Sequence, residues 1–283
     1  YFNLAGDPSG QSETITRNKV GHFAYEDAYG NGTVTVPVSQ PDTDVNACLV
    51  GNPFVAHVDL KDFMQENGIS EVKVFDGTSN TNNSLILVDG ELVSSNNASL
   101  TNIKPMEAFF VMNYTGKSVK FTDGMLNAGS SEAFTRSAAP SRPGTALRLA
   151  ATRDGHTAHA LLRVSPGASA DVVPGEDTQL LVEGEARPAV AVYTVAGGRA
   201  LDIQQVPEGP AAIPLGFYLP DGGKADIRLT LDFTDPQWTD WFLVDQRTGQ
   251  RQRITHTTIT LHGVESGSGQ YALMKNEELT INH

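Results

Sequence analysis

The 283-residue chain is acidic, with 33 acidic and 20 basic residues and a formal net charge of −13. Such a chain lacks the basic surface that neutralises phosphates, so we expect no nucleic-acid partner and no attraction to an anionic membrane surface. Hydrophobic residues make up 39% of the chain, and 27 glycines and 15 prolines are spread along it, which predicts a folded, turn-rich and mainly β protein.

The length exceeds that of most single domains, which favours two domains. No run of 18 apolar residues is present, so no membrane-spanning helix is expected. The chain begins at Tyr1 without an initiating methionine, and we expect a piece of a longer polypeptide or a mature form.

The first predicted elements are a hairpin and a short buried strand. Residues 22–25 and 33–38 have strand composition and are joined through Asn31-Gly32, a dipeptide that favours tight hairpin turns. Residues 47–50 form the next strand and contain Cys48, the only cysteine. We expect a buried thiol there rather than a nucleophile, because no histidine lies near it in the sequence; a single cysteine also excludes an intrachain disulfide.

Residues 59–68 predict one short helix, the only regular helix that we expect. Asp59 is suited to accept hydrogen bonds from the free N–H groups of the first turn, and Gly68 to adopt the left-handed conformation after the last turn. Leu60, Phe63 and Met64 fall on one helical face, which predicts that this face is buried.

Further strands are predicted at residues 71–75 and 103–112, where apolar residues alternate or run together. Between them, residues 85–93 contain two apolar runs on either side of Asp89-Gly90. This arrangement predicts a β-hairpin with a two-residue turn.

Residues 135–145 contain two prolines, a glycine and no large apolar side chain, and we place an interdomain linker there. Residues 146–283 consist of predicted strands, with 193–220 in the middle of the domain and 225–233 alternating cleanly between apolar and polar residues. We therefore expect a mainly β fold with two β-sandwich-like domains, residues 1–134 with the short helix and residues 146–283.

Several of these segments resemble a module of exported and surface proteins of Bacteroidetes. Residues 49–54, LVGNPF, followed by a short acidic helix and by residues 103–111, IKPMEAFFV, match the "VGNP" strand end, the aspartate-led segment and the "I-x-P-x-x-x-F-F-V" strand of that module. The second half resembles the region that often follows it, at residues 147–149, 192–203, 213–217 and 243–249. The resemblance spans about residues 45–275 and implies a non-catalytic C-terminal module of a large surface protein; it brings no catalytic residue with it.

Histidine pairs are the first candidates for a metal site. His156 and His159 lie three residues apart, so on a strand they point to opposite faces, and joint binding would require a turn. His256 and His262 would share a strand face but lack a third ligand. A surface loop is the simpler interpretation of the first pair.

Two oxygen-rich loops are candidates for calcium. Residues 76–83 carry suitable side chains but lack the spacing and the closing glutamate of an EF-hand loop, and Asp171 with Glu176 and Asp177 gives a second acidic loop. Turn formation accounts for both loops, so no cofactor is expected, with calcium kept as the alternative.

Trp238 is the single candidate for ligand binding. It lies among acids and amides at the start of a strand, where an exposed indole would stack on a sugar ring. Trp241 opens an apolar run, and we expect it in the core.

No Gly-x-Ser-x-Gly, His-Glu-x-x-His or phosphate-binding glycine loop is present. We therefore expect a structural or adhesive module, without catalysis of its own, of a bacterial exported or cell-surface protein associated with the outer membrane. Its expected partners are the rest of a larger surface protein, other surface proteins or glycans. The alternatives are a carbohydrate-binding module and the accessory domains of a larger surface enzyme.

Overall fold

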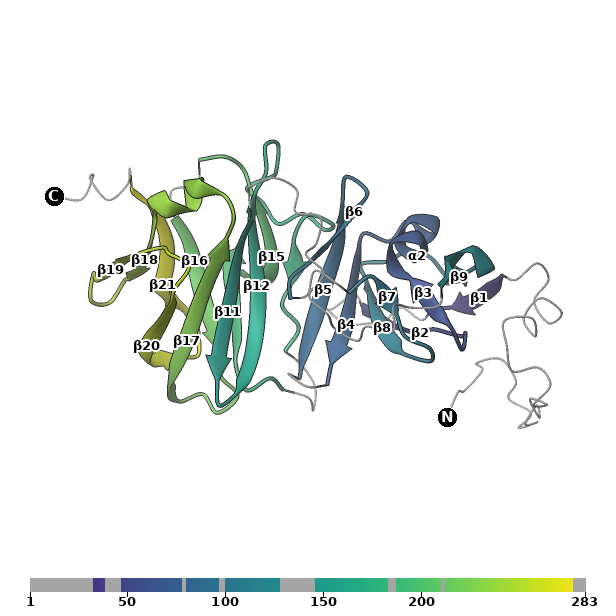
Figure 1. Cartoon of the computed structure of the whole chain (residues 1–283), viewed down its shortest axis with the longest axis horizontal. Coiled ribbons are helices and arrows are strands. Elements are labelled where there is room, and N and C mark those ends of the chain that lie inside the picture. The colour runs from purple at the N-terminus through teal and green to yellow at the C-terminus, as the bar shows by residue number, and fades with distance from the viewer. Residues whose placement is uncertain are drawn as a thin grey trace. The chain divides into compact units, whose positions relative to one another are not determined.

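The computed structural model describes residues 33–38, 47–77, 80–96, 100–127, 146–182, 187–209 and 212–276. The fold is mainly β, as the sequence predicts, and divides into two compact units (Figure 1). The first unit comprises residues 1–72 and 100–135, and the second comprises residues 73–99 and 136–283. The predicted strand at 22–25, its Asn31-Gly32 turn and the predicted linker at 135–145 lie outside the described residues.

The division assigns residues 73–99 to the second unit, whereas the sequence suggested that they belong with the first part of the chain. Tertiary packing explains the difference. Ile86 is fully buried in a small apolar cluster with Leu161 and Ile203, which come from the second half of the chain. The first unit is therefore discontinuous in sequence.

In the part of the first unit that the structure describes, small antiparallel sheets pack with one α-helix. Strand β1 pairs with β9, β3 lies between β10 and β7, and β2 pairs with β8. The elements of this unit are β1 (Val34–Pro37), β2 (Ala47–Gly51), β3 (His57–Asp59), α2 (Leu60–Asn67), β7 (Asn102–Ile103), β8 (Ala108–Met112), β9 (Ser118–Phe121), the 3-10 helix η2 (Asp123–Met125) and β10 (Leu126–Asn127). Strand β4 (Glu71–Asp76) begins in the first unit and ends in the second.

Helix α2 begins and ends where the sequence predicts. The Asp59 side chain accepts a hydrogen bond from the Asp62 backbone N–H at 3.0 Å, which caps the first turn. Gly68 has φ 62°, the left-handed conformation that lets the chain leave the helix. The predicted apolar face is buried, with Phe63 stacked on Phe121 at a centroid distance of 4.7 Å.

The second unit contains one large sheet of eleven strands. Its strand order is β19-β18-β21-β16-β14-β15-β12-β11-β17-β20, with β13 paired to β15, and all pairings are antiparallel except β12 with β15. The hairpin β5 (Thr81–Val88) and β6 (Glu91–Ser94) also belongs to this unit, and its turn is Asp89-Gly90, as predicted. The other elements are β11 (Ala146–Arg153), β12 (His156–Val164), β13 (Thr178–Gln179), β14 (Ala191–Ala196), β15 (Arg199–Val206), β16 (Ala212–Tyr218), β17 (Lys224–Phe233), the 3-10 helix η3 (Pro236–Asp240), β18 (Trp241–Asp245), β19 (Arg251–Arg253), β20 (Thr258–Glu265) and β21 (Gly267–Lys275).

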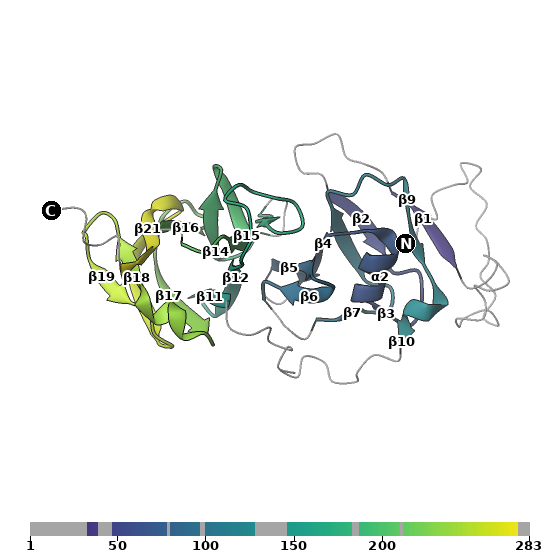
Figure 2. The ribbon, with the colours of Figure 1, turned by 90° about the horizontal axis from the view of Figure 1, so that it is seen from above.

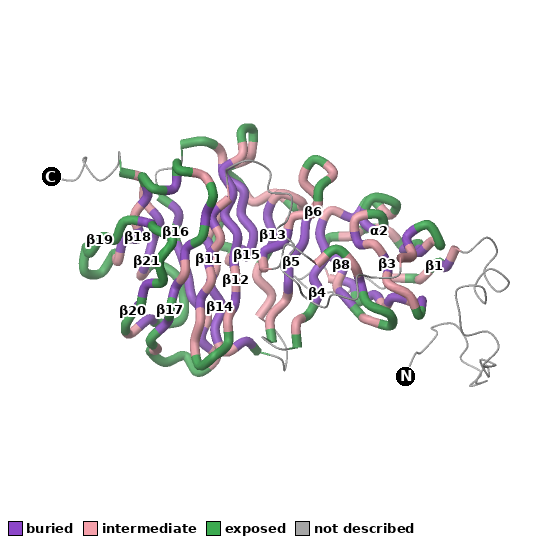
Figure 3. The backbone as a smooth tube through the Cα atoms, viewed as in Figure 1, coloured by how far each residue is buried: buried purple, intermediate pink, exposed green. Residues whose placement is uncertain are grey.

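This large sheet curls around a single apolar core. Leu243 of β18 and Ile259 of β20, which come from near opposite ends of the strand order, belong to the same buried cluster. Figure 2 shows the labelled strands arranged around this common interior, and Figure 3 shows buried stretches along them. Strands facing one another across one core give the second unit its sandwich-like layers.

Strands β14, β15 and β16 cover most of the stretch 193–220 and lie in the middle of the sheet order, as the sequence predicts. At their centre the ring of Tyr193 lies directly over Gly216, its partner on the neighbouring strand. A Cβ atom at residue 216 would lie 2.2 Å from that ring, so any other residue there would have to displace the tyrosine ring.

Strand β17 confirms the predicted alternation. Its residues Ile227, Leu229, Leu231 and Phe233 are buried. The opposite face is exposed and carries polar pairs with β20 and the residues just before it. We refer to this surface as the exposed polar face; its pairs are Lys224–Glu265, Asp226–His262, Thr230–Thr258 and Asp232–His256.

Candidate functional site

The most concentrated chemistry in the described residues is a buried polar cluster in the second unit, here called the Lys73 cluster. It consists of Lys73 on β4, Ser84 on β5, Thr178 on β13 and Asp202 on β15. Four separate strands contribute one side chain each. Two of them come from residues 73–99 and two from the second half of the chain.

Hydrogen bonds join the four side chains. Lys73 Nζ donates to Ser84 Oγ and lies 3.4 Å from Asp202 Oδ2. Ser84 Oγ donates to the same oxygen, Oδ2, at 2.5 Å, and Thr178 Oγ1 donates to Asp202 Oδ1. Both carboxylate oxygens therefore receive a hydroxyl hydrogen bond, and Ser84 lies between the amine and the carboxylate.

These groups are sealed from solvent. Lys73, Ser84 and Thr178 are 0% exposed and Asp202 is 2% exposed. Burying a charged group is costly unless a partner of opposite charge and several hydrogen bonds compensate it. The cluster therefore ties residues 73–99 to the second half of the chain through groups that depend on one another.

Backbone and side-chain bonds hold the hairpin beside this cluster. Ser95 Oγ accepts from the Ser84 backbone N–H at 3.1 Å, and the Ser95 N–H donates to the Ser84 carbonyl at 2.9 Å. Arg148 Nη1 of β11 donates to the Ser94 carbonyl at 3.1 Å. Burial lowers the pKa of the Arg148 guanidinium, an effect that the negative charge of Asp232 partly offsets.

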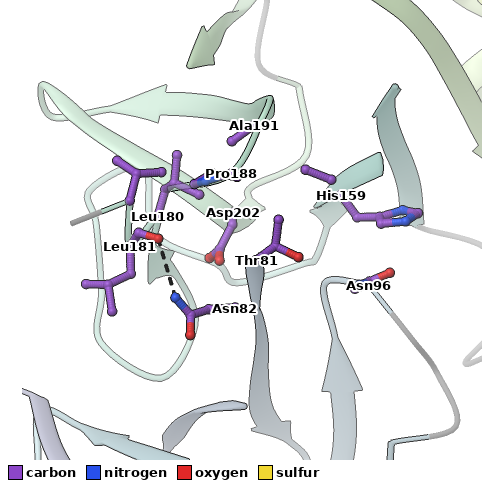
Figure 4. A pocket seen from close by; sticks show the side chains of 11 residues that line it. Thr81, Asn82, Asn96, His159, Leu180, Leu181, Pro188, Ala191 and Asp202 are labelled. Atoms are coloured by element: carbon purple, nitrogen blue, oxygen red, sulfur yellow. Dashed lines mark hydrogen bonds between the residues drawn. The ribbon is translucent and has the colours of Figure 1, made fainter. Parts of the chain in front are cut away.

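A cavity of about 10 Å³ adjoins the cluster, and Asp202 forms part of its wall (Figure 4). This volume has room for roughly one water molecule. Polar wall residues include Thr81, Asn82 and His159, and Asn82 Nδ2 donates to the Leu181 carbonyl at 3.5 Å. Burial, together with the charge of Arg148, lowers the pKa of His159 to about 4, so its imidazole is neutral at neutral pH.

The arrangement has the parts of an activated nucleophile, since a serine hydroxyl next to an amine is one way to generate an alkoxide. An external substrate could not reach Ser84 in this conformation. None of the four side chains has an appreciable exposed surface, and the adjoining cavity holds no more than about one water molecule. The chemistry available to Ser84 in this conformation is internal to the protein.

Trp238 does not lie on the surface, where the sequence analysis predicted it. The prediction of an exposed indole is wrong: Trp238 is 0% exposed and packs in the main core of the second unit with Trp241 at a centroid distance of 5.2 Å. The polar neighbours of Trp238 form η3, in which the Asp235 side chain caps the Gln237 N–H at 2.9 Å while the indole points inward. The sugar-binding role predicted for Trp238 depended on an exposed ring and loses its basis.

In the second acidic loop, Asp177 and Glu176 use their carboxylate oxygens for backbone hydrogen bonds. Asp177 Oδ2 accepts from the Val173 N–H and Oδ1 from the Gln205 N–H, both at 2.8 Å. Glu176 Oε2 accepts from the Ser169 N–H at 3.4 Å. Among the described residues, no group of three or more histidine, cysteine, aspartate or glutamate side chains is arranged to hold a metal ion.

The histidine pairs do not converge. His156 is exposed on β12, whereas His159, three residues on, lines the cavity. His256 Nδ1 lies 3.3 Å from Asp232, and His262 Nδ1 lies 2.9 Å from Asp226, so each histidine has its own carboxylate on the exposed polar face.

Cys48 is buried in β2, as predicted, and burial raises the pKa of its thiol above the ordinary value. A raised pKa keeps the sulfur protonated at neutral pH. This thiol packs in the first unit as a small apolar side chain.

Sequence reasoning did not find the Lys73 cluster. The one sequence feature that bears on it is Asp202 between Leu201 and Ile203, and that pattern alone does not name a partner; only the structure shows that every residue of β4 from Glu71 to Val74 is buried, so that both faces of the strand are covered. A charged residue inside such a strand requires a buried partner.

No protein-family model matches the sequence, and neither a curated protein nor a solved structure matches it. In the part of the chain that the structure describes, no helix is long and apolar enough to cross a membrane.

Proposed function

We propose that the chain is a structural or adhesive module, without catalysis of its own, of an exported or cell-surface bacterial protein. The observation that carries the proposal is the sealed Lys73 cluster. The side chains best equipped for chemistry are buried and bonded to one another, and they join strands that are far apart in the sequence.

The composition agrees with such a role. A net charge of −13 and a turn-rich β fold suit a soluble part of a larger surface protein. The resemblance of residues 45–275 to surface modules of Bacteroidetes supports the same location and two of the expected partners, the rest of a longer polypeptide and other surface proteins. Glycans are the partners of the alternative, a carbohydrate-binding module. An outer-membrane association belongs to this proposal and rests on that resemblance.

A direct test compares the wild-type protein with a Ser84→Ala variant in three assays. Chromogenic ester and peptide substrates report turnover, a glycan array reports carbohydrate binding, and beads coated with the protein report adhesion to bacterial or host surfaces. We expect equal, background-level turnover for both proteins, no binding on the glycan array, and equal adhesion of beads coated with either protein.

Two results would overturn the proposal. Turnover that disappears in Ser84→Ala would identify Ser84 as a nucleophile and the chain as an enzyme domain. Saturable binding to a defined glycan would make the chain a carbohydrate-binding module, with a site other than the buried Trp238.

A further inference from the structure

We propose that Lys73 and Asp202 become joined by an amide bond between Nζ and Cγ, an internal cross-link formed with loss of one water molecule. The inference is independent of the proposed structural role. Lys73 Nζ lies 3.4 Å from Asp202 Oδ2, so the amine is held beside the carboxyl group that contains Cγ, the atom it would attack. Holding two reactants in this way gives effective concentrations of ~10⁵–10⁸ M in favourable cases.

The two hydroxyl groups of the cluster occupy the positions that the condensation requires. Ser84 Oγ is hydrogen-bonded to both reacting groups, because it accepts from Lys73 Nζ and donates to Asp202 Oδ2. It is therefore placed to pass a proton from the nitrogen to the departing oxygen. Thr178 Oγ1 donates to Oδ1, the oxygen that carries negative charge in the tetrahedral intermediate.

The atoms balance without an external reagent. A proton moves from the ammonium to the carboxylate, which leaves a neutral amine and a carboxylic acid. The nitrogen lone pair attacks Cγ, and the C–N bond forms. The nitrogen then loses a proton through Ser84 Oγ to Oδ2, the Cγ–Oδ2 bond breaks and Oδ2 leaves as water. Oδ1 remains as the amide carbonyl, held by Thr178.

Burial favours both the condensation of Lys73 with Asp202 and the amide that it forms. An ion pair in a dry interior carries a large desolvation cost, and the amide removes both charges while keeping hydrogen-bonding groups. Exclusion of solvent from side chains that are 0–2% exposed also protects the amide from hydrolysis. The adjoining cavity of about 10 Å³, partly walled by Asp202, has room for roughly one water molecule, which is the size of the leaving group.

The protein contains its own control. Lys224 Nζ lies closer to its carboxylate, 2.7 Å from Glu265 Oε1, but the two side chains are 67% and 49% exposed. Water competes for both groups and stabilises both charges there. We expect condensation at the buried pair and none at the exposed pair.

The decisive measurement is the intact mass of the purified, denatured full chain. We expect a mass lower than the sequence mass by one water molecule in all or part of the wild-type protein. After trypsin digestion, a branched peptide should join residues 62–117 to residues 200–224, since trypsin cleaves neither at an acylated lysine nor at Lys104, which precedes proline. A folded wild-type protein that has only the unaltered sequence mass would overturn the proposal, as would a branch that maps to another pair.

Variants separate the roles of the four side chains. Lys73→Met should have its full sequence mass, and Lys224→Met should keep the loss of one water. Asp202→Asn should lose one ammonia instead of one water, because the side-chain amide nitrogen becomes the leaving group; an Asn variant that is folded and loses nothing would contradict the mechanism. Ser84→Ala, followed after cell-free synthesis, should cross-link at least about 100-fold more slowly than wild type, whereas an unchanged rate would remove Ser84 from its assigned role as the proton relay.

Discussion

Two lysine–carboxylate pairs in the second unit have the same chemistry and opposite surroundings. Lys224 and Glu265 lie 2.7 Å apart on the exposed polar face, and Lys73 and Asp202 lie 3.4 Å apart in the interior. The exposed pair has the shorter distance but contributes less to the stability of the fold, because water and dissolved ions screen exposed charges. The buried pair has no such screening, so each charge depends on the other. Burial, rather than separation, decides how strongly the fold depends on a pair.

The largest expected effect comes from breaking the buried pair on one side. Relative to the wild-type chain that has not cross-linked, Lys73→Met leaves Asp202 as an uncompensated buried carboxylate, and we expect a loss of about 3–5 kcal/mol in the free energy of unfolding. Urea denaturation followed by far-UV circular dichroism measures the loss. Lys224→Met is the matched change on the surface, and its denaturation midpoint should stay within experimental scatter of wild type.

Replacing both buried partners sharpens the comparison. The double variant Lys73→Met with Asp202→Leu removes both charges and should recover most of the stability lost by the single variant. A double variant no more stable than Lys73→Met would show that packing around the four strands, rather than an unpaired charge, accounts for the loss.

The next largest effect is expected from acid, which should lower the free energy of unfolding through the imidazole of His159. The pKa of His159 is about 4 in the folded protein, against an ordinary value of 6.5, so between these values the unfolded chain binds a proton that the folded chain does not. Stability should therefore fall as the pH drops from 6.5 to 4, by up to about 3 kcal/mol. Urea midpoints at pH 7 and pH 4.5 for wild type and His159→Gln test this. His156→Gln, on the same strand but exposed, is the control and should keep the wild-type pH dependence.

A smaller loss in the free energy of unfolding is expected when Arg148, which binds the β5–β6 hairpin, is replaced. Arg148→Met removes the hydrogen bonds to the Ser94 and Ser95 carbonyls and should cost about 1–2 kcal/mol. The same variant should raise the pKa of His159, because the charge of Arg148 helps to lower it. An NMR titration of the imidazole checks the second effect. Arg251→Met, on the exposed strand β19, should change neither quantity.

The smallest effect is expected on the exposed polar face. The hydrogen bond from His262, followed by that from the Gly263 N–H, lowers the pKa of Asp226 below its ordinary value. The contribution to stability is therefore present above the ordinary carboxylate pKa and is lost as the pH falls through the lowered one. An NMR titration of Asp226 should show the low midpoint in wild type, a higher midpoint in His262→Ala, and no change in His256→Ala.

Local sequence patterns predicted the local structure well. The capping residues at Asp59 and Gly68 marked the ends of α2, the Asp89-Gly90 dipeptide marked the turn between β5 and β6, and alternation marked the buried face of β17. In each case the interactions that fix the element lie within a few residues, so the sequence window contains them.

Features set by distant residues were not predictable in this way. Lys73 and Asp202 are 129 positions apart, and a lysine in an alternating strand or an aspartate in an apolar run has the same local pattern whether it faces water or a buried partner. The same limit explains the error at Trp238. Its polar neighbours are exposed, but a 3-10 turn directs the indole into the core, and the core is assembled from strands elsewhere in the chain.

The discontinuous first unit has a consequence for biosynthesis. The hairpin β5–β6 is synthesised long before β12 and β15, the strands that carry Leu161 and Ile203, against which Ile86 packs. Domains commonly fold one after another as the chain emerges, N-terminal domain first. Here Ile86 cannot complete its packing before the second half of the chain has been made. This packing becomes possible only once β15, which ends at Val206, has been synthesised.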